Sequence, residues 1–95
     1  MNTIEVDRAV TEAEIRRLKS TIATPQQALA IEAVAADAYV QWEREYPGQG
    51  LGVKDSAIVA GRALHDEGYA TSAEEGRLLV FAARSWLYEA RRLFA

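Results

Sequence analysis

The run RLLVFAARSWLYEARRLF, residues 77–94, decides the fold expected for this chain. It is rich in helix-forming residues and has apolar side chains on nearly every side, which predicts one long helix. Ser72 and Glu75 form a capping box, so we expect this helix to span 73–94. Its core-facing residues cluster around Leu79 at helical spacing: Ala83, Trp86, Leu87, Ala90, Leu93 and Phe94.

A second group of side chains on this run lies away from the core-facing side. Steps of four and three residues align five of them on one face: Arg77, Phe81, Arg84, Tyr88 and Arg91. Arginine offers carboxylates a planar, two-pronged donor, and arginine and aromatic residues are enriched where proteins meet. We therefore predict that this stripe binds a partner protein with an acidic surface. The alternative is a solvated outer face whose rings are covered by the amino-terminal residues or the first helix.

The first quarter of the chain predicts an extended arm followed by a helix. Apolar and polar residues alternate in TIEV, residues 3–6, so residues 1–10 are expected to form an arm, or a short strand, packed on the bundle. Thr11 and Glu14 then form a capping box, which predicts a helix over 12–22. The narrow apolar stripe of this helix consists of Ile15, Leu18 and Ile22.

A second helix is expected over 25–46, because Thr24 can cap it and Pro25 suits the first helical position. Its apolar side chains form two opposite stripes. One consists of Ala28, Ile31, Ala35, Tyr39, Trp42 and Tyr46, and the other of Leu29, Ala33, Ala36 and Val40. A helix that is apolar on two sides predicts a central helix packed from both directions. The alternative is that one side is an oligomer interface, in which case the chain forms a homodimer.

A third helix is expected over 55–67, between the turn-rich loop PGQGLG at 47–52 and Gly68. Asp55 or Ser56 can cap it. One face carries small side chains that let another helix approach closely: Ala57, Ala60 and Gly61, next to Leu64. The fold class predicted for residues 1–95 is therefore all-α, a single domain that forms a compact bundle of four helices.

The composition argues against several classes of protein. The chain of 95 residues contains no cysteine, so neither a disulfide framework nor thiolate chemistry is expected. No apolar run approaches the roughly 20 residues of a membrane span. The first ten residues lack the basic-then-apolar pattern of an export signal, so we expect the protein in the cytoplasm.

The sequence supplies little for catalysis. His65, the one histidine, is followed by Asp66 and Glu67, and adjacent helical residues point about 100° apart, so they cannot chelate one ion. Ser85 has no base set against it. The glycines of the 47–52 loop lack the lysine and the preceding strand of a phosphate-binding loop. We expect a protein that is not an enzyme and needs no metal or cofactor.

Charge is distributed unevenly along the chain. Residues 1–75 carry seven Lys or Arg against 13 Asp or Glu, whereas residues 76–95 carry four arginines against Glu89. The net charge of −3 is unlike that of a general nucleic-acid binder, and Glu74 and Glu75 at the start of the last helix would repel phosphates. A regulator that binds DNA or RNA through the same arginine face is nevertheless the alternative function.

The run TEAEI at 11–15, followed by Leu18 and by TI at 21–22, is similar to the start of a helix in the small four-helix immunity proteins that neutralise bacterial colicin nucleases. The tyrosine-bearing helix with which those proteins block their target has no counterpart here. The expected function is a small, non-catalytic protein-binding module. A stoichiometric inhibitor of the immunity or anti-defence type is the leading example.

Overall fold

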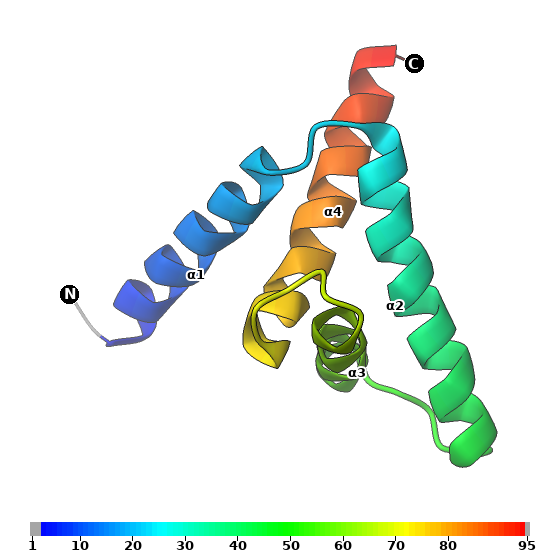
Figure 1. The fold of residues 1–95 in the computed structure, drawn as a ribbon. Coiled ribbons are helices and arrows are strands. Elements are labelled where there is room, and N and C mark those ends of the chain that lie inside the picture. Colours follow the sequence, from blue (N-terminus) through cyan, green and yellow to red (C-terminus); the bar gives the residue numbers. More distant parts are fainter. Residues whose placement is uncertain (1–2, 95) are drawn as a thin grey trace.

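The computed structural model describes the backbone of residues 3–94 and the side chains of residues 7–52 and 55–93. Its four helices are α1 (Thr3–Ser20), α2 (Pro25–Glu45), α3 (Val53–Asp66) and α4 (Ala73–Phe94), as Figure 1 shows. The described residues contain no strand. The predicted all-α, four-helix bundle is thereby confirmed.

The predicted amino-terminal arm is wrong, because residues 3–10 belong to α1. Thr11 consequently lies inside a helix rather than at its cap, and the carboxylate of Glu14 accepts hydrogen bonds from Arg17 instead of reaching back. Each residue added to an existing helix gains a backbone hydrogen bond at little further cost, which a lone extended segment cannot match. Residues 1–2, and the side chains of residues 3–6, lie outside the described part of the chain.

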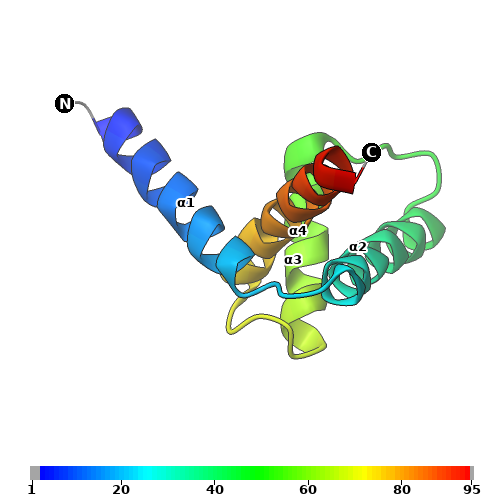
Figure 2. The same ribbon diagram turned by 90° about the horizontal axis from the view of Figure 1, so that it is seen from above.

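Helix α4, not α2, is the central helix. Among the described residues, it packs against α1, α2 and α3, whereas α2 contacts only α3 and α4, and α1 contacts only α4 (Figures 1 and 2). The buried side chains of α4 accordingly cover much of its circumference: Leu78, Leu79, Val80, Ala82 and Ala83. The prediction that α2 is packed from two directions is wrong, since its second apolar stripe faces outward.

The core is built from small and aliphatic side chains. Besides those of α4 it contains Leu18, Ile22, Ala28, Ile31, Ala35, Ala60 and Leu64, with Ile15, Trp86 and Leu87 packed against it. Trp42 of α2, like Trp86, is partly rather than fully buried. Leu93, predicted to face the core, is 79% exposed because the carboxyl end of α4 projects past the bundle (Figure 1).

Helices α3 and α4 cross in close contact at Gly61 and Gly76, both buried. The predicted face of small residues on α3 is confirmed by the burial of Ala57, Ala60 and Leu64. Helix α3 begins after Gly52, which supplies no side-chain cap, so the predicted Asp55 or Ser56 cap is wrong.

The caps of the other helix ends follow the sequence closely. Thr24 accepts from the Gln27 N–H and the Gln27 side chain accepts from the Thr24 N–H, which is a full capping box. At α4 the Ser72 hydroxyl accepts from the Glu75 N–H. Gly68, with φ +84°, terminates α3 as predicted, two residues beyond its last helical residue, Asp66. The N–H of Tyr69 donates to the Leu64 carbonyl and that of Gly68 to the His65 carbonyl, the pair of bonds of a Schellman motif.

The amino-terminal turns of α1 extend away from the other three helices (Figures 1 and 2). Leu18 and Ile22 are buried at its other end, and Lys19 pairs with Glu89 of α4. The Cα radius of gyration is 14.2 Å, whereas a globule of this length is expected at about 12 to 13 Å. The excess fits these projecting turns and the projecting end of α4. None of the described helices is long and apolar enough to cross a membrane.

Candidate partner-binding surface

The five residues of the predicted stripe fall into two groups along α4. Arg77 and Phe81 lie in its amino-terminal half and are both partly buried. The Arg77 guanidinium donates to both carboxylate oxygens of Glu74, at 3.3 and 2.6 Å, and thereby lowers the pKa of that carboxyl. Arg77 is therefore engaged within its own helix.

Arg84 connects α4 to α2. Its Nε donates to Glu32 Oε1 at 3.1 Å and its Nη2 donates to the Tyr39 hydroxyl at 3.2 Å. Arg84 was expected to lie to the side of the core-facing surface, and its side chain lies on the flank of α4 that adjoins α2. The side chain is still 45% exposed, so the guanidinium is held in place without being buried.

The last two turns of α4 present a ring between two guanidinium groups. Tyr88 is 65% exposed, and Arg91 and Arg92 follow it by three and four residues, which places them on either side of it. The Arg92 Cζ lies 6.0 Å from the centre of the ring, a cation–π contact. We call Arg84, Tyr88, Arg91 and Arg92 the Tyr88 face.

Arg92 was not among the predicted site residues. Its spacing of four from Tyr88 was the signal that could have identified it, because residues four apart on a helix are neighbours. The structure thus keeps three predicted residues together, Arg84, Tyr88 and Arg91, and adds Arg92 in place of Arg77 and Phe81.

The charge of the Tyr88 face is largely unopposed. Glu32 neutralises Arg84, and Glu89, the one acid in this part of α4, pairs with Lys19. Arg91 and Arg92 form no ion pair with any described residue. Cations at a helix carboxyl end interact favourably with its dipole, which accounts for two arginines here but not for the exposed ring.

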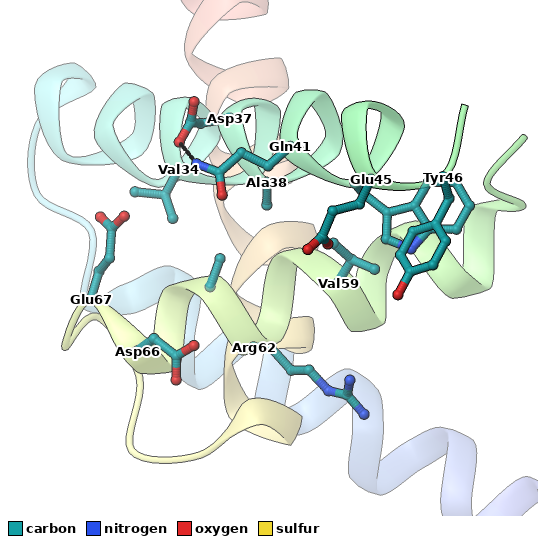
Figure 3. A pocket seen from close by; sticks show the side chains of 12 residues that line it. Val34, Asp37, Ala38, Gln41, Glu45, Tyr46, Val59, Arg62, Asp66 and Glu67 are labelled. Carbon is teal, nitrogen blue, oxygen red and sulfur yellow. Dashed lines mark hydrogen bonds between the residues drawn. The ribbon is translucent and has the colours of Figure 1, made fainter. Parts of the chain in front are cut away.

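A second feature is a groove of about 440 Å³ between α2 and α3 (Figure 3). Its aliphatic lining comes from Val34, Ala38, Val59 and Ala63. Trp42 and Tyr46, whose ring centres lie 5.1 Å apart, also line it. Four carboxylates and one arginine rim it: Asp37, Glu45, Asp66, Glu67 and Arg62. This combination suits a cationic ligand with an apolar portion.

Among the described residues, no three histidine, aspartate or glutamate side chains converge to hold a metal ion. His65 is exposed, and its Nδ1 lies 3.8 Å from Oδ1 of Asp66, its neighbour in sequence. What the Tyr88 face can do chemically is bind carboxylates through planar, charged donors around an apolar ring.

Comparison of this chain with protein-family models, with curated proteins and with solved structures finds no match.

Proposed function

We propose that this protein is a small, non-catalytic module that binds an acidic protein surface through the Tyr88 face, and that it acts stoichiometrically, as an inhibitor of the immunity or anti-defence type does. The observation that carries the proposal is the exposed ring of Tyr88 between two arginines that no described acid neutralises. Exposed aromatic and arginine side chains of this kind dominate the binding energy of protein interfaces.

The face is also ordered before it binds. Arg84 is fixed by Glu32 and Tyr39, and the Arg92 guanidinium already lies over the Tyr88 ring. Immobilising a flexible side chain at an interface costs about 0.5 to 1.5 kcal/mol, so side chains that are already fixed lose less entropy on binding. The intramolecular contacts therefore favour partner binding while leaving part of each guanidinium free.

Charge favours a protein over a nucleic acid as the partner. The chain carries a net charge of −3, and Glu32 lies directly beside Arg84, where it would repel a phosphate backbone. A ring flanked by arginines gains from the desolvated contact that a folded protein surface offers. Binding of DNA or RNA by the same face is the competing outcome of the test below.

The test is affinity capture from a cell extract, with and without nuclease, followed by mass spectrometry. Three baits are compared: wild type, the Tyr88→Ala/Arg91→Ala variant, and Arg77→Ala as the matched control, whose arginine lies on the same helix outside the face. We expect a protein that wild type and the control retain and the double variant loses, whatever the nuclease treatment. Retention of the same proteins by all three baits, or loss of every specific protein after nuclease, would overturn the proposal.

A further inference from the structure

The second apolar stripe of α2 is uncovered. Leu29 and Val40 are 56% and 49% exposed, and Ala33 and Ala36 between them are exposed as well. Helix α2 packs on α3 and α4 with its opposite side, through Ala28, Ile31 and Ala35. We call Leu29, Ala33, Ala36 and Val40 the outer stripe.

The outer stripe is complementary to itself. Its members are separated by four, three and four residues, which is the apolar spacing of a coiled-coil seam. The order of these separations is unchanged when the helix is reversed. An antiparallel second copy therefore places Leu29 of each chain against Val40 of the other and Ala33 against Ala36, with small side chains at the centre that allow close approach. Such a contact has the twofold symmetry of most homodimers.

Charge outside the stripe favours the same antiparallel arrangement. Helices α2 and α4 run in opposite directions (Figure 1), and the Arg84–Glu32 pair joins them. Arg91, two turns beyond Arg84, therefore lies level with the amino end of α2. Glu43 lies near the carboxyl end of α2, on the same flank as Glu32, because eleven residues make close to three turns. Both Arg91 and Glu43 are exposed and form no ion pair with the described residues.

We propose that a second copy of this chain binds the outer stripe in antiparallel orientation, so that Arg91 of each copy faces Glu43 of the other. A twofold axis through the centre of the stripe keeps the same flank of both α2 helices on one side. The amino end of one α2, and Arg91 of the same copy, then lie next to the carboxyl end of the other α2. A parallel twofold pairing would instead place Arg91 of one copy and Glu43 of the other at opposite ends of the paired helices, where they could not meet. The inference is separate from the proposed function, since the two surfaces share Arg91 alone.

Disulfide trapping tests the orientation, because the chain has no cysteine of its own. In the antiparallel dimer residue 29 of one copy lies opposite residue 40 of the other, whereas the two copies of residue 29 are about 16 Å apart along the helices, beyond the reach of a disulfide. When equal amounts of Leu29→Cys and Val40→Cys chains are oxidised together, random pairing would give half of the disulfide-linked dimers as mixed dimers. The antiparallel dimer should give a much larger mixed fraction. Leu93→Cys, exposed but outside the stripe, is the control. The statistical proportion of mixed disulfide, or a predominant disulfide between two Leu29→Cys chains, would overturn the proposal.

Charge exchange tests the ion pair and keeps the two proposals distinguishable. In sedimentation equilibrium, wild type should approach twice its 10.5 kDa mass as concentration rises. Arg91→Glu and Glu43→Arg should each weaken the dimer roughly tenfold at low salt, and their combination should restore it to about wild type. Tyr88→Ala should leave the dimer intact, whereas Ala36→Glu should abolish it and leave partner capture unchanged. A monomer at all concentrations, or no restoration in the combined variant, would refute the antiparallel dimer.

Discussion

Gly61 of α3 and Gly76 of α4 lie backbone against backbone where the two helices cross. A Cβ atom on Gly61 would lie 2.5 Å from the Ala73 carbonyl oxygen and 2.6 Å from the Arg77 nitrogen. A Cβ atom on Gly76 would overlap the Gly61 carbonyl group. All of these neighbours are backbone atoms, which cannot move aside as a flexible side chain can, so this crossing requires glycine on both helices.

Replacing Gly61 by alanine is therefore expected to destabilise the protein. The added methyl group must push α3 and α4 apart, and overpacking of this kind costs about 1 to 3 kcal/mol, which exceeds the gain of up to about 1 kcal/mol from alanine's higher helix propensity. The measurement is urea unfolding followed by circular dichroism. Gly50→Ala is the control, because a Cβ atom there meets nothing within 4 Å. Equal stability of Gly61→Ala and Gly50→Ala would contradict the close crossing.

The ion pair between Arg84 and Glu32 should contribute modestly to stability. Both side chains remain partly exposed, at 45% and 30%, and exposed pairs contribute about 0.2 to 1 kcal/mol. A double-mutant cycle with Arg84→Ala and Glu32→Ala should return a coupling energy in that range. Arg62→Ala, which removes an exposed arginine that forms no ion pair with the described residues, should leave the unfolding free energy nearly unchanged. Strictly additive effects of the two alanine substitutions would show that the pair does not join α4 to α2.

The capping region of α4 should respond to acid. Hydrogen bonding to Arg77 lowers the pKa of Glu74 below its ordinary value of 4.5. A carboxyl group whose pKa is lower in the folded state than in the unfolded state stabilises the fold above the unfolded pKa, and this contribution is lost as the pH falls through the folded pKa. Stability should accordingly decline below about pH 4.5. In Arg77→Ala the pKa of Glu74, followed by NMR titration of its side-chain carboxyl carbon, should rise. An unchanged value in that variant would rule out Arg77 as the cause.

Helices with strong local signals at their ends could be predicted from the sequence. The Thr24–Pro25 start of α2 and the Ser72–Glu75 start of α4 lie where their patterns indicate. The start of α1 was missed because Thr11 followed by Glu14 has the same spacing at a helix start and inside a helix. Local patterns alone cannot distinguish the two.

Features that depend on the packing of distant segments were predicted less well. The two apolar stripes of α2 suggested a central helix. A sequence does not show whether an apolar stripe is covered by its own chain or by another one. In this structure the outer stripe is exposed to solvent. Arg84 projects from the flank of α4, so whether it contacts another helix depends on where α2 packs, which the sequence does not show. Tyr88 and Arg91, further along α4, are exposed.

The most direct test of the Tyr88 face is calorimetric titration of the captured partner protein with wild type, Tyr88→Ala, Arg91→Ala, the double variant and the Arg77→Ala control. Central interface residues of these types contribute about 2 kcal/mol or more, so Tyr88→Ala should weaken binding roughly 30-fold and the double variant further, while circular dichroism stays unchanged. Binding by wild type should also weaken with salt, since the arginines lie exposed. The control should bind within about twofold of wild type. If the double variant binds as tightly as wild type, the Tyr88 face does not bind the partner.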